Sequence, residues 1–96
     1  MVYKYFVNCE VGTFGMMYNL ETKLVGIGGH FSMLDIMSTL IVEGFKKNLP
    51  AMEKVQPTKI RFVFKYETKD FFNTIKELEN SGIVIVATKK LGRVMI

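Results

Sequence analysis

The sequence has little material for disulfide bonds, zinc–thiolate sites or membrane spans. Cys9 is its single cysteine, so no intrachain disulfide can form, and no cysteine–histidine spacing typical of zinc occurs. The longest purely apolar runs, such as residues 83–87, are far shorter than the roughly 18 residues that a membrane span requires. The N-terminal residues also lack the pattern of a secretory signal. We therefore expect a cytoplasmic location, in a cell or in an infected host cell, and no membrane contact.

The sequence also lacks a strong excess of either positive or negative charge. Thirteen lysines and arginines against nine acidic residues give a net charge of +4, which permits contact with nucleic acid without requiring it. Eight phenylalanines and four tyrosines exclude a disordered chain, because they can form a buried core. A chain of 96 residues with this composition is expected to form a single globular domain over residues 1–96.

Hydrophobic periodicity predicts an α+β domain of mixed α/β character. The predicted elements are strands at 2–9, 14–18 and 23–27, a helix at 32–48, a strand at 60–66, a helix at 70–80 and a strand at 83–87. Short connections favour a three-strand antiparallel meander, followed by helix–strand–helix–strand in a mixed sheet with the helices packed on it. The last strand is apolar on both faces, which is typical of a central position. Residues 51–58 are expected to form a connection, and residues 89–92 a turn.

Four acidic residues lie near the ends of these elements. Asp35 is in the first turn of the first helix, where it can complete a capping box with Ser32. Glu67 follows the fourth strand, with Asp70 close behind, and both can simply favour the positive end of the second helix. Glu10 lies just beyond the first strand. All four also suit a hard divalent cation, which prefers oxygen ligands.

The element order and these acids resemble the ribonuclease H-like superfold over roughly residues 1–88. The resemblance implies that acids from the first strand, the first helix and the end of the fourth strand hold two Mg or Mn ions, which activate water against a phosphodiester. At the first-strand position this chain has Asn8, which brings no charge, with Glu10 two residues later. A ferredoxin-like or profilin-like α+β sandwich is the alternative fold.

Two further groups suggest phosphate chemistry. His30, the only histidine, lies in the turn Gly28–Ser32 and could act as a general base, a phosphate contact or a ligand, or be an exposed loop residue. Lys89, Lys90 and Arg93 form the densest basic group. They are candidate contacts to nucleic acid phosphates or to an acidic protein partner, and otherwise a solvated turn.

Aromatic residues of the predicted strands offer a possible base-stacking surface. Tyr3, Tyr5, Phe62 and Phe64 could stack on bases if the sheet exposes them. At strand spacing, the same residues more often belong to the core.

We favour a small binding module over an enzyme. The first hypothesis is a degenerate ribonuclease H-like domain that binds nucleic acid or a nucleotide; its catalytic alternative is a metal-dependent phosphodiesterase or nuclease that uses Glu10, Asp35 and Glu67. The second is a non-catalytic homodimer or inhibitor that pairs through a strand edge at 60–66 or 93–96. The third is a small-ligand enzyme built on the histidine turn.

Overall fold

The computed structural model describes the backbone of residues 1–91 and the side chains of residues 1–83. Arg93 and the proposed pairing edge at 93–96 therefore lie outside the described residues. The elements in chain order are β1 (Val2–Cys9), β2 (Gly12–Asn19), β3 (Leu24–His30), the 3-10 turn η1 (Phe31–Met33), α1 (Leu34–Thr39), the π-helical turn η2 (Leu40–Gly44), β4 (Met52–Gln56), β5 (Lys59–Lys65), α2 (Thr68–Asn80) and β6 (Val84–Leu91).

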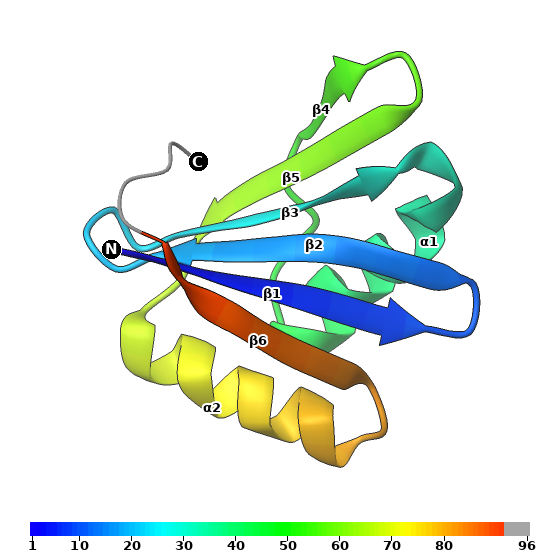
Figure 1. The fold of residues 1–96 in the computed structure, drawn as a ribbon. Coiled ribbons are helices and arrows are strands. Elements are labelled where there is room, and N and C mark those ends of the chain that lie inside the picture. Colours follow the sequence, from blue (N-terminus) through cyan, green and yellow to red (C-terminus); the bar gives the residue numbers. More distant parts are fainter. Residues whose placement is uncertain (92–96) are drawn as a thin grey trace.

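The six strands form one sheet in the order β4-β5-β3-β2-β1-β6 (Figure 1). The predicted meander of β1, β2 and β3 is confirmed, but the prediction of a mixed sheet is wrong, because all the described pairings are antiparallel. Each helix does connect two strands that run in the same direction. Those strands are not neighbours, since β5 separates β3 from β4, and three strands separate β5 from β6.

The strand β4 was not predicted, and its presence changes the role of β5. All five β4 residues are exposed, so this strand carries no hydrophobic alternation that a sequence could show. Strand β3 pairs with β5 over Lys59–Lys65, and β4 covers the other side of β5 over Lys59–Phe62. Within the proposed pairing edge at 60–66, residues 60–62 therefore have no free edge for a second copy.

The final strand lies at an edge of the sheet rather than at its centre. The strand β6 pairs with β1 alone among the described strands, and it continues through Leu91, where residues 89–92 were expected to turn. Its continuous apolar run was the basis of the wrong placement. An edge strand can also be apolar, so the run itself does not distinguish the two positions.

The start of the first helix differs from the predicted capping box. The ring Nδ1 of His30 accepts a hydrogen bond from the backbone N–H of Ser32 at 3.1 Å, and the Ser32 hydroxyl lies 2.9 Å from the same nitrogen. Asp35 makes no capping hydrogen bond and is exposed. The second helix begins and ends close to its predicted bounds, and Gly82 follows it with a φ of +93°, a conformation that favours glycine.

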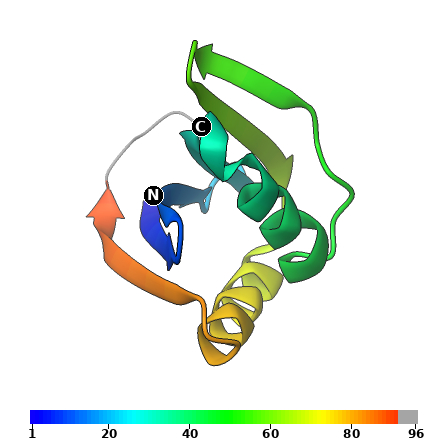
Figure 2. The same cartoon turned by 90° about the vertical axis from the view of Figure 1, so that its right-hand side faces the viewer.

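Both helices pack on the same side of the curved sheet (Figure 2). At the centre of this core, the rings of Tyr18 and Phe71 stack with their centroids 4.1 Å apart, and Phe45 lies 5.9 Å from Phe71. The Tyr18 hydroxyl donates to the backbone carbonyl of Tyr66 at 2.7 Å. The opposite face of the sheet carries no helix among the described residues, and this face holds the candidate site.

Candidate binding site on the open sheet face

A row of residues without bulky side chains crosses the middle of the open face. In the strand register, Phe6 of β1 is opposite Gly15 of β2, Gly15 is opposite Gly28 of β3, and Gly28 is opposite Arg61 of β5. Because side chains alternate along a strand and the neighbours of Phe6 are buried in the core, this row faces away from the helices. The two glycines therefore leave a flat trough between the Phe6 ring and the Arg61 side chain.

The trough is large enough for a small planar molecule. Neighbouring strands are about 4.8 Å apart, so Phe6 and Arg61 are separated by roughly 14 Å across three strand spacings. The cavity above the glycines has a volume of about 510 Å³, within the range of small-ligand sites. Phe6 is 36% exposed, which leaves part of its ring available to a ligand. The ammonium of Lys4 lies 5.1 Å from the centre of the same ring.

Polar and basic residues line one end of the trough. His30 is opposite Lys59 in the register, and Thr13, Gln56 and Arg61 complete this part of the lining. The guanidinium of Arg61 contacts one carboxylate oxygen of Glu53, with Nη2 at 2.7 Å and Nε at 3.2 Å. Since this ion pair is exposed to water, it holds Arg61 only weakly, and an anionic ligand could compete for it.

The structure gives His30 a defined orientation. Because its Nδ1 accepts the Ser32 N–H, the neutral ring carries its proton on Nε2. Of the candidate site residues within residues 1–83, His30 is the one that lies on this trough. Its hydrogen bonds to Ser32 account for its position at the start of the helix without a catalytic role.

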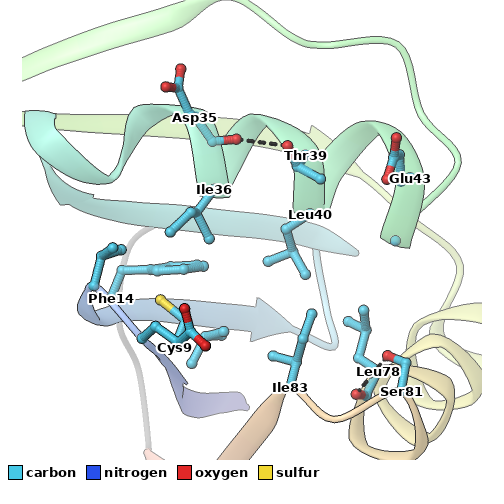
Figure 3. A pocket seen from close by; sticks show the side chains of 14 residues that line it. Cys9, Phe14, Asp35, Ile36, Thr39, Leu40, Glu43, Leu78, Ser81 and Ile83 are labelled. Carbon is cyan, nitrogen blue, oxygen red and sulfur yellow. Dashed lines mark hydrogen bonds between the residues drawn. The ribbon is translucent and has the colours of Figure 1, made fainter.

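The four candidate metal ligands divide between two ends of the molecule. Glu10 and Asp35 line a separate groove beside α1, shown in Figure 3. Glu67 lies at the other end of the sheet, where its carboxylate pairs with Lys23 at 2.9 Å, and Asp70 follows in the first turn of α2. The eight residues of β2 between these ends correspond to roughly 25 Å.

This separation prevents the acids from holding a shared pair of ions, which lie only about 4 Å from each other in two-metal sites. Among the residues that the structure describes, no group of three or more His, Cys, Asp or Glu could hold a metal ion. Glu67 instead raises the pKa of the Lys23 ammonium by accepting its hydrogen bond and by its negative charge. Its observed role is an exposed ion pair.

The core position of the four strand aromatic residues is confirmed, and the open face carries Phe6 instead. Tyr5 and Phe62 are buried on the helix side, and Tyr3 and Phe64 pack against the same core. Phe6 was missed because residues 5–7 are all apolar, so either phase of the alternation fits the sequence. The backbone of Lys89 and Lys90 lies in β6, at the edge beside β1.

Comparisons with protein families, with curated proteins and with solved structures found no match to this chain. Within residues 1–91, no helix is long and apolar enough to span a bilayer.

Proposed function

We propose that this protein is a non-catalytic binding module that takes a nucleotide unit, an aromatic base with its phosphate, in the glycine trough. The observation that carries the proposal is the row of Phe6, Gly15, Gly28 and Arg61, which places a ring and a guanidinium on either side of a stretch of backbone where the two glycines project no side chain. A free nucleotide and one unit of a single-stranded nucleic acid share this chemistry.

The base is the part of the ligand that the glycines admit. A planar ring can approach the Gly15 and Gly28 backbone closely, because neither residue projects a side chain. The Phe6 ring then supplies an aromatic contact at the edge of the trough. Contacts between a base and an aromatic side chain contribute about 1–3 kcal/mol per base in proteins that bind single strands.

The phosphate is the part that the basic end of the trough attracts. Lys59 and Arg61 lie two residues apart on the same face of β5, toward the same end as His30. A phosphate can accept two parallel hydrogen bonds from a guanidinium, whereas the Glu53 carboxylate uses one oxygen for both contacts. We therefore expect the phosphate to displace Glu53 from Arg61 on binding.

A non-catalytic role fits the positions of the acids better than a nuclease does. The resemblance to the ribonuclease H-like superfold implies a joint ion site of Glu10, Asp35 and Glu67, and these residues lie at two ends of the sheet. The proposal therefore depends on the trough and not on that resemblance.

The test is a titration of fluorescein-labelled oligothymidylate followed by anisotropy at low salt. We expect Phe6→Ala to weaken binding by about 5- to 150-fold, the equivalent of 1–3 kcal/mol, while the native fold is retained. Arg61→Gln should weaken binding and reduce its salt dependence by about one phosphate contact. Lys76→Gln on α2 makes the same change in net charge outside the trough and should leave affinity within about twofold.

Competition with adenosine monophosphate separates the two sources of the ligand. Displacement of the oligonucleotide at similar concentrations of phosphate groups identifies a mononucleotide site, and weak displacement identifies a single-strand site. Equal affinities of the native protein, Phe6→Ala and Arg61→Gln for both ligands would contradict the proposal.

A further inference from the structure

A second cavity lies on the helix side of the sheet, away from the trough. It is a groove of about 520 Å³ where the turn after β1, the turn η2 and the end of α2 meet (Figure 3). The floor of the groove is apolar. It is formed by Val7, Phe14, Ile36, Leu40, Leu78 and Ile83.

The rim of this groove carries acidic side chains, and two of them are regularly spaced along the helix. Glu10, Asp35 and Glu43 line it, all three are exposed, and none has an ion-pair partner among residues 1–83. Figure 3 shows the carboxylates of Asp35 and Glu43 on the same outer side of the helix, with Ile36 and Leu40 directed into the groove. Eight positions along a helix correspond to about two turns, or roughly 12 Å.

The helix itself departs from regular geometry at the groove. The π-helical turn η2 spans Leu40–Gly44 and contributes Leu40, Glu43 and Gly44 to the lining. A Cβ at Gly44 would meet the Leu78 side chain at 3.1 Å, so glycine permits close contact with α2 at this end. Such π-helical turns are frequent at functional sites, which is an observation independent of the charges.

We propose that this groove docks a basic amphipathic helix of a partner protein. The apolar floor matches the apolar stripe of such a helix, and the rim charges two turns apart match lysines or arginines spaced seven or eight residues apart. Long basic side chains can lay their methylene stems along apolar surface while their charged ends reach the rim. The negative rim disfavours nucleic acid here, so this site differs from the trough in both position and ligand.

The probe is a fluorescein-labelled synthetic peptide of leucine and lysine, about 14 residues long, with leucines on one helical face. We expect it to bind the native protein at low salt and to bind the double variant Asp35→Asn/Glu43→Gln about 2- to 30-fold more weakly, the range for two solvent-exposed ion pairs. The double variant Glu77→Gln/Glu79→Gln makes the same change in net charge on α2 outside the groove, and its affinity should stay within twofold. A peptide with glutamate in place of lysine should not bind.

Three outcomes would overturn this proposal. The first is equal weakening by the two double variants, which would show a general effect of net charge. The second is that calorimetry detects binding of dodecylammonium while the peptide does not bind. This result would identify a small amphiphile as the ligand. The third is a dimer in sedimentation that only the groove variant abolishes, which would make a second copy the occupant. The nucleotide titration is read at different residues, so either proposal can fail without the other.

Discussion

The two faces of the sheet are built from the same strands, but one is packed with buried side chains and the other carries a trough. On the helix side, Tyr18 and Phe71 are fully buried and stacked at the centre of the core. On the open side, the central row contains Gly15 and Gly28 and leaves a trough. Because successive residues alternate between the faces, neighbours in sequence should have separate effects on stability and on binding.

The largest effect is expected from removing the ring at the centre of the core. Phe71→Ala should lower the free energy of unfolding by about 3–5 kcal/mol, since the side chain is fully buried and stacks on Tyr18. Denaturant unfolding followed by circular dichroism measures this loss. Phe6→Ala on the open face should cost less than half as much, and an equal loss at both positions would break the comparison.

Two glycines on opposite faces of the sheet, Gly29 of β3 and Gly15 of β2, provide the next test. A Cβ at Gly29 would lie 2.8 Å from the Phe14 Cβ, so Gly29→Ala should lower the free energy of unfolding by about 1–3 kcal/mol through overpacking. A Cβ at Gly15 would meet its nearest atom, the Gly28 carbonyl oxygen, at 3.8 Å. Gly15→Ala should therefore leave stability nearly unchanged while it weakens oligothymidylate binding. A larger loss of unfolding free energy in Gly15→Ala than in Gly29→Ala would contradict this assignment of the faces.

Alkaline pH should affect the helix side through Tyr5. Burial, with smaller contributions from Tyr3 and Glu79, raises the pKa of the Tyr5 phenol from 10.0 to about 12. Since the folded protein holds this proton more tightly than the unfolded chain, the stabilisation is complete below pH 10 and is lost as the pH rises toward 12. At about pH 11 the native protein should have lost roughly 1 kcal/mol relative to its value at about pH 9 through this group.

The control for this pH dependence is Tyr5→Phe, which keeps the ring and removes the titrating group. The variant should show a smaller loss of stability than the native protein over the same interval, measured by urea unfolding at each pH. Identical slopes for the two proteins would contradict the assignment.

The smallest effect is expected at Glu53, where the substitution should strengthen oligothymidylate binding rather than weaken it. Glu53→Gln frees the Arg61 guanidinium from its carboxylate partner, so oligothymidylate affinity should rise about two- to fivefold. The free energy of unfolding should change by less than about 1 kcal/mol. Anisotropy titrations of Glu53→Gln and Arg61→Gln side by side should move in opposite directions. A loss of affinity in both variants would mean that the ion pair itself forms the site.

The sequence predicted the elements with strong local patterns and missed those that depend on distant contacts. The first strand at 2–9 was found from its β-branched and aromatic residues, and the helix near 70–80 from the helical spacing of its apolar residues. The strand β4 was missed because all its residues are exposed, and it forms only by pairing with β5. The antiparallel sheet could not be derived without that strand.

The candidate site could be predicted from local sequence patterns even less than the fold. Gly15 and Gly28 are visible in the sequence, but their pairing follows from the register of two strands, which no local pattern specifies. The acids appeared related because each lies near an element end, whereas the fold places Glu10 and Glu67 at opposite ends of the sheet. His30 was found from its turn, but its contact with the trough depends on β5.

The most direct test of the nucleotide site is a titration of the ¹⁵N-labelled protein with adenosine monophosphate, followed by amide chemical shifts. We predict that the shifts concentrate at Phe6, Gly15, Gly28 and Arg61, and that Phe6→Ala removes them. Shifts confined to the groove residues Ile36 and Leu40, or no shifts at millimolar nucleotide, would contradict the account.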